Sequence, residues 1–91
     1  MIYSVLLTTC GNPDRGQNPY EALWGVPTER VYGASIEELQ RIVRNYIEEY
    51  DLGGGNWAGG EVYDGTGNVI GHISYNGRYW TKEEWNEINN A

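Results

Sequence analysis

Residues 35–52 show the clearest pattern of apolar and polar positions in the chain. Apolar side chains recur there at helical spacing, at Ile36, Leu39, Ile42, Val43, Tyr46, Ile47 and Tyr50. Polar and charged residues fill the other side, as in a helix that buries one face. Ser35, followed three residues later by Glu38, matches a capping box at the helix start, and Gly53 suits a left-handed residue at its end. The pattern predicts one amphipathic helix that other elements must cover.

Two strands are predicted before this helix. Residues 2–9, with the sequence IYSVLLTT, are rich in β-branched and aromatic side chains. Apolar groups occur on both of their alternating faces, which predicts a central strand covered on both sides. Residues 29–33 predict a short strand that leads into the helix cap.

The intervening residues 10–28 contain turn-forming Gly, Asn and Pro but also an apolar group of Tyr20, Leu23, Trp24 and Val26. This much apolar surface argues against free disorder. We therefore expect the segment to fold back over part of the domain.

Three strands and a short helix are predicted after the main helix. A strand begins within the glycine-rich residues 53–60 and runs to Asp64, and residues 68–75 and 78–80 form the next two strands. Asn76-Gly77 is typical of a two-residue type I′ hairpin turn. Thr81 and Glu84 form a second capping box, and Trp80 and Trp85 are spaced as a hydrophobic staple. The order β-β-α-β-β-β-α predicts an α+β fold, a small antiparallel sheet with the main helix on one face.

The type I′ turn also predicts which side chains share a face, because it pairs Ile73 with Trp80 and Ser74 with Tyr79. The helix side would then hold Val69, Gly71, Ile73, Tyr75 and Trp80, and, if the loop at residues 64–67 has an even number of residues, also Ala58, Gly60 and Val62. The opposite face would hold the candidate binding residues Trp57, Glu61, Tyr63, His72 and Tyr79, together with Ile70 and Ser74. Either this aromatic face is exposed for binding, or residues 20–26 or the last helix cover it.

Composition narrows the classes of function. The 91 residues, predicted as one domain over residues 1–91, carry a net charge of −7 and include four Trp and eight Tyr. Six basic residues without a cluster argue against nucleic-acid binding, and the acidity favours a basic protein partner or simply solubility. Cys10 is the single cysteine, so it has no disulfide partner within the chain. We expect a cytoplasmic protein, because the sequence shows no signal-peptide pattern and no membrane-spanning apolar run.

Candidate chemistry is sparse. His72 could exchange protons with Ser74 or Glu61, but the sequence supplies no nucleophile turn or oxyanion hole, so we assign no catalytic residue. Cys10 is expected to be a small buried side chain. The carboxylates lack metal-ligand spacing, and the Gly53–Ala58 glycines follow a helix instead of preceding one, so we expect no metal and no cofactor.

Two resemblances accompany this interpretation. Residues 35–90 run α-β-β-β-α, which resembles a double-stranded RNA-binding domain in topology. The last helix, however, sets Lys82 against Glu83, Glu84 and Glu87, so that family's function is not carried over. The whole pattern also resembles small phage- and plasmid-encoded accessory proteins, including CRISPR inhibitors, which are acidic, cysteine-poor and act by binding.

The functional hypothesis is a non-enzymatic protein-binding module of unknown oligomeric state. The alternative is a small-ligand-binding protein or enzyme with a pocket between residues 10–28 and the aromatic face.

Overall fold

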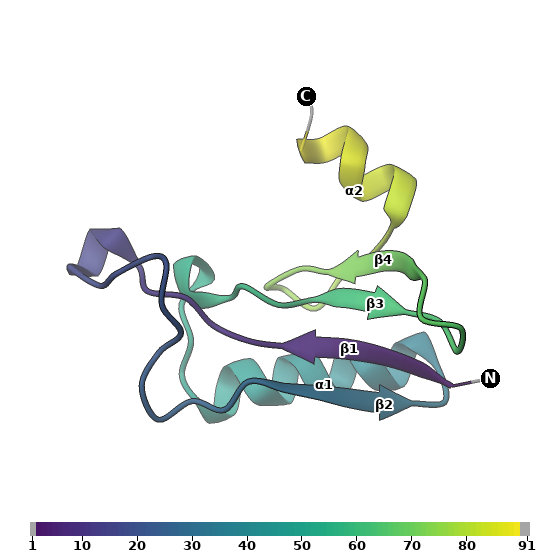
Figure 1. The fold of residues 1–91 in the computed structure, drawn as a ribbon, viewed down its shortest axis with the longest axis horizontal. Coiled ribbons are helices and arrows are strands. Elements are labelled where there is room, and N and C mark those ends of the chain that lie inside the picture. Colours follow the sequence, from purple (N-terminus) through teal and green to yellow (C-terminus); the bar gives the residue numbers. More distant parts are fainter. Residues whose placement is uncertain (1, 90–91) are drawn as a thin grey trace.

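A computed structural model describes residues 2–89 and shows an antiparallel sheet with one long helix against it (Figure 1). The ends of the predicted domain, residue 1 and residues 90–91, lie outside the described range. The strands are β1 (Tyr3–Leu7), β2 (Glu29–Gly33), β3 (Glu61–Tyr63), β4 (Val69–Ile73) and β5 (Tyr79–Thr81). The helices are α1 (Ile36–Glu49) and α2 (Lys82–Asn89), with 3-10 turns at Pro13–Arg15 and Gly54–Asn56. The α+β prediction is confirmed.

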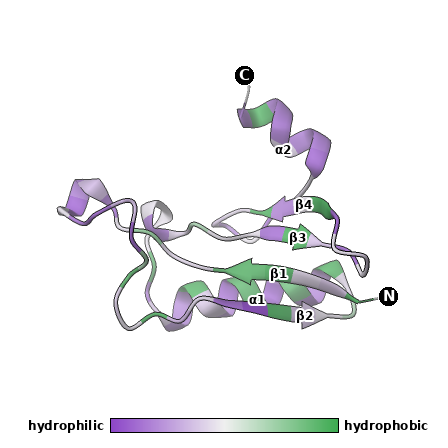
Figure 2. Ribbon diagram, in the orientation of Figure 1, coloured by the Kyte–Doolittle hydropathy of each residue, from purple (hydrophilic) through white to green (hydrophobic). Residues whose placement is uncertain are grey.

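The sheet is five-stranded, with the order β2-β1-β3-β4-β5, and all its pairs are antiparallel. β1 is an interior strand, as predicted. Its Val5 and Leu7 belong to the core together with residues of α1. Figure 2 shows that β1 is largely hydrophobic and that α1 alternates between hydrophobic and hydrophilic segments. The α1 stripe is the predicted one. The core consists of Val5, Leu7, Leu39, Val43, Tyr46, Ile47, Leu52, Val62 and Ile73.

The caps of α1 explain its limits. The Ser35 hydroxyl accepts a hydrogen bond from the Glu38 N–H (3.2 Å), and the Glu38 carboxylate accepts one from the Ala34 N–H (2.9 Å). At the other end, Asp51 and not Gly53 adopts the left-handed conformation, with φ of 51°. The Leu52 N–H donates to the Ile47 carbonyl (3.0 Å), which closes a Schellman motif. The helix ends earlier than predicted because this ending folds Leu52 into the core.

The predicted type I′ turn at Asn76-Gly77 is wrong. Tyr79 lies opposite Ile73 and Trp80 lies opposite His72, a shift of one residue from the predicted pairing. A type I′ turn needs positive φ at both Asn76 and Gly77. Gly77 has φ of 87°, but Asn76 does not, because Asp51 is the one non-glycine residue between 2 and 89 with positive φ. The Gly77 N–H donates to the Ser74 carbonyl (2.8 Å). The connection is therefore a three-residue loop that ends in a left-handed glycine.

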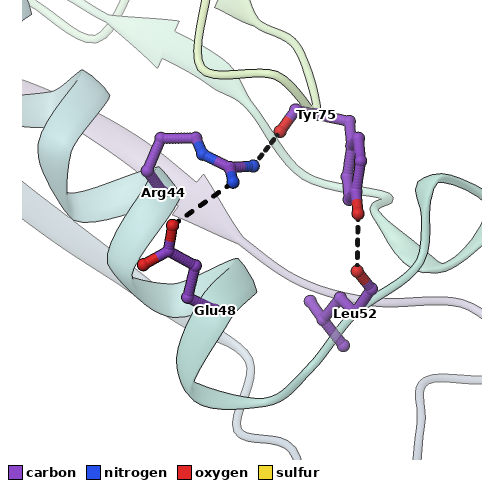
Figure 3. Close-up of polar contacts among 4 residues, drawn as sticks. All are labelled: Arg44, Glu48, Leu52 and Tyr75. Carbon is purple, nitrogen blue, oxygen red and sulfur yellow. Dashed lines mark hydrogen bonds and ion pairs between the residues drawn. The ribbon is translucent and has the colours of Figure 1, made fainter.

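Contacts with α1 favour this wider loop. The Arg44 guanidinium donates to the Tyr75 carbonyl (2.7 Å) and to the Glu48 carboxylate (3.4 Å), and the Tyr75 hydroxyl donates to the Leu52 carbonyl (2.9 Å; Figure 3). The Gln40 amide donates to the Gly77 carbonyl (3.0 Å). The loop is thus held by tertiary hydrogen bonds that the local Asn-Gly signal does not report.

Residues 10–28 lie beyond the end of β1 and not over the sheet (Figure 1). The half-buried Leu23 and Val26 pack against the core, and the Tyr46 hydroxyl donates to the Pro27 carbonyl (2.7 Å). Tyr20 and Trp24 point outward, with 94% and 99% of their surfaces exposed. Two of the four apolar residues therefore pack as expected, but the other two do not, and the segment lies at the end of the fold.

Capping also starts α2 as predicted. The Glu84 carboxylate accepts from the Thr81 N–H (2.9 Å), and the Glu84 N–H donates to the Thr81 hydroxyl (3.2 Å). The Trp80 and Trp85 ring centres are 6.5 Å apart. Neither helix within residues 2–89 combines the length and apolar character that crossing a membrane requires.

Gly77→Ala should destabilise the fold more than Gly67→Ala does. Both glycines have φ near +88°, so a side chain at either position costs about 1–2 kcal/mol in backbone strain. A Cβ at Gly67 meets nothing within 4 Å, whereas at Gly77 it would lie 2.7 Å from the Arg44 Cγ. Moving Arg44 would disturb its bond to Tyr75 and cost about 1 kcal/mol more. Urea unfolding measures both variants, and equal losses would contradict the docked loop.

Candidate functional site

The sheet face opposite α1 is the candidate site, and we call it the open face. Cross-strand pairing places Ser4 beside Tyr32 and Tyr63, Leu6 beside Arg30, and His72 between Glu61 and Trp80. α2 stands at the β4–β5 end of the sheet and leaves the β2–β1 end uncovered (Figure 1). The open face is thus a surface rich in aromatic side chains, with one end beneath a helix and the other end free.

A cleft of about 300 Å³ lies where α2 meets the open face. Its polar and aromatic lining comes from Glu61, His72, Lys82 and Trp85, and Leu6 and Ala58 contribute to its floor. The His72 and Trp85 rings stack at 3.8 Å between centres, with their planes 12° apart. Burial lowers the pKa of the His72 imidazole below its usual value near 6.5, although the Glu61 carboxylate opposes this shift. This shift favours the neutral form of the stacked imidazole.

A second hollow, of about 490 Å³, lies at the β2 end of the open face. The Arg30 guanidinium carbon is 4.3 Å from the Tyr63 ring centre, and Arg30 also donates to the Ser4 hydroxyl (3.3 Å). The Tyr63 hydroxyl donates to the Glu61 carboxylate (2.6 Å), and this bond raises the pKa of Tyr63 above its usual range. Tyr32 completes the rim with 64% of its surface exposed. The Glu61–Tyr63–Arg30 chain thus connects the two hollows.

Three of the five predicted binding residues, Glu61, Tyr63 and His72, come together on the open face. The other two, Trp57 and Tyr79, lie on the helix side. Two one-residue shifts, at different places in the sheet, account for this.

Trp57 lies on the helix side because a bulge lies between it and β3. Thr9 pairs with Trp57 and Val5 pairs with Val62, so the chain from Trp57 to Val62 advances five residues while β1 and its extension advance four. The extra residue falls beside Gly60, whose φ is 109°. The Trp57 indole donates to the Ile73 carbonyl (3.1 Å), and its ring centre lies 6.0 Å from that of Tyr46 in α1.

Tyr79 changes face because of the three-residue loop. It lies opposite Ile73, and its ring covers the bare backbone of Gly71, where a Cβ would come within 2.5 Å of the phenol oxygen. Its hydroxyl donates to the Ile70 carbonyl (3.2 Å), and burial raises its pKa. Trp80 takes the place on the open face that the sequence assigned to Tyr79.

Arg30, Tyr32, Trp80 and Trp85 are open-face residues that the candidate set did not include. The alternation of Arg30 and Tyr32 along residues 29–33 could have placed them on one face, once β2 was paired with β1. The staple spacing of Trp85 was recognised, but not its stacking on His72.

The polar groups bind each other and do not form a proton-transfer set. The Ser74 hydroxyl donates to the Asn76 side chain (2.6 Å), and Glu61 is engaged by Tyr63. The half-buried Cys10 thiol donates to the Gly55 carbonyl (3.4 Å). Within residues 2–89, no group of three or more His, Cys, Asp or Glu side chains could hold a metal ion.

No family model, curated protein or solved structure matches the chain. The case for function therefore rests on the open face itself.

His72 should make stability fall in acid. Its folded-state pKa is lowered, so the folded state disfavours the proton that the unfolded chain accepts near pH 6.5. The free energy of unfolding that the neutral His72 ring contributes is fully present above pH 6.5. It is lost as the pH falls toward the folded-state pKa. Urea unfolding at pH 8, 6.5 and 5 should show the wild type losing more stability than His72→Gln. Parallel pH profiles would contradict the buried neutral imidazole.

Proposed function

We propose that the protein is a non-enzymatic binding module that holds another protein on its open face. The observation that carries this proposal is that the β2–β1 end of the face is uncovered and presents Tyr32, Tyr63 and Arg30 around a hollow. Tyr, Trp and Arg are the residue types that dominate interface energy. Tyr63 and Arg30 are already fixed by their mutual contact and by hydrogen bonds, so binding orders fewer side chains.

Charge favours a basic partner. The net charge of −7 steers a basic surface toward the molecule and raises the association rate at low salt. The resemblance to phage- and plasmid-encoded accessory proteins supports an inhibitor-like role in which the module occludes its partner's surface. We place this activity in the cytoplasm, where the single thiol of Cys10 stays reduced.

Tyr32→Ala tests this function. The immobilised protein is used to capture partners from a lysate of the cells that express it, and capture is compared between variants. Tyr20→Ala is the matched control, because Tyr20 is also an exposed tyrosine but lies in residues 10–28. Loss of an anchor costs about 2 kcal/mol or more, so Tyr32→Ala should weaken capture roughly thirtyfold while Tyr20→Ala leaves it unchanged. The reverse order would move the interface to residues 10–28.

The second candidate function is small-ligand binding in the cleft beneath α2. Its volume of about 300 Å³ is at the lower end of ligand sites, and an indole, an imidazole, an ammonium and a carboxylate line it. The predicted pocket between residues 10–28 and the aromatic face is a different place, since residues 10–28 line neither hollow of the open face. Lys82→Gln should abolish ligand binding but spare protein capture, which separates the two functions.

A further inference from the structure

β2 forms one edge of the sheet, and the direction of its peptide groups follows from the strand beside it. The Leu6 carbonyl of β1 accepts from the Gly60 N–H (2.8 Å), so the peptide groups of Leu6 turn toward β3. Alternation then turns those of Val5 toward β2, where Val31 lies opposite. Val31 is therefore bonded to β1.

Arg30 and Tyr32 flank Val31, so their peptide groups point away from the sheet. Within residues 2–89, the backbone N–H and carbonyl groups of these two residues have no hydrogen-bond partner outside the strand ladder. The outer side of β2 can therefore accept another strand.

This edge lacks the usual protection against strand pairing. The opposite edge, β5, has three residues and continues directly into α2. β2 has five residues in regular register with β1, and it contains no proline, lysine or bulge. Its one cation, Arg30, is drawn over the Tyr63 ring and away from the edge. Proteins normally shield an exposed edge of this kind.

Apolar surface lies beside β2 on both faces of the sheet. Between β2 and α1, a groove of about 270 Å³ is lined by Val31, Ile42, Leu7 and Tyr46, with polar groups at its rim. On the open-face side, Tyr32 is 64% exposed. A strand added to β2 would cover both.

We propose that this strand is β2 of a second copy, paired antiparallel about a two-fold axis at Val31. Arg30 then lies opposite Tyr32 of the second copy, and the two outward-pointing residues exchange both backbone hydrogen bonds. Val31 lies opposite itself on the groove side, and Glu29 lies opposite Gly33. No two like charges oppose each other, so the sequence of β2 is complementary to itself. The two open faces join into one continuous surface.

Sedimentation velocity on the purified protein, from about 10 μM to about 1 mM, tests this pairing independently of the proposed function. We expect a reversible monomer–dimer equilibrium. Tyr32→Pro removes an N–H that β1 does not use and that both copies need, so it should weaken dimerisation at least about tenfold. Tyr32→Ala is the matched control, because it keeps the N–H and should weaken the dimer less. A monomer throughout, or a Tyr32→Pro dimer as strong as the wild type, would overturn the proposal.

Cross-linking tests the register without relying on Tyr32→Pro to fold. In a Cys10→Ser background, Val31→Cys should form an intermolecular disulfide under mild oxidation, because directly opposed residues of a non-hydrogen-bonded pair have Cα atoms about 4.5 Å apart. Tyr32→Cys should cross-link more slowly, because its opposite residue is Arg30. Faster cross-linking of Tyr32→Cys would overturn the register. If the wild type is monomeric at every concentration and Tyr32→Ala weakens capture of another protein, the edge binds that protein and not a second copy.

Discussion

Burial of the α1 stripe is the constraint on which the rest of the structure depends. Leu39, Val43 and Ile47 are fully or almost fully buried, so they need an apolar surface to cover them. Val5, Val62 and Ile73 supply that surface from three different strands. Because a strand alternates its side chains, assigning these residues to the helix also assigns their neighbours to the other face. Packing against α1 therefore determines which residues of the strands, polar and aromatic ones among them, lie on the open face.

The elements that the sequence predicted well are those whose signals are local. The α1 stripe, both capping boxes and the strand at residues 29–33 depend on side chains within a few positions of each other, and all are present. The assignment of faces failed at Trp57 and Tyr79, because each depends on one added residue. The bulge beside Gly60 and the loop held by Arg44 are decided by contacts with distant strands and with α1.

These two shifts are linked by the core that they complete. The Trp57 indole donates to the Ile73 carbonyl, and Tyr79 pairs with the same Ile73, so both aromatic rings are brought to the helix side around one residue of β4. Small residues make room for them, since the Tyr79 ring occupies the space that a Cβ of Gly71 would need. Gly71 therefore marks the place where a large ring packs against the sheet, which the sequence pattern alone indicated only as a small residue on the core side.

The position of α2 explains why one end of the open face is uncovered. α2 is anchored at β4 and β5 by the His72–Trp85 stack and by the cap at Thr81, so it protects one edge and one end of the open face. Eight residues of helix do not reach β2 at the far side of the sheet. Tyr32 and the outward peptide groups beside it are exposed because β2 is an edge strand and α2 stands at the other side of the sheet (Figure 1). The edge strand and the aromatic surface meet at Tyr32, so under both proposals a partner that pairs with β2 would also cover the open face.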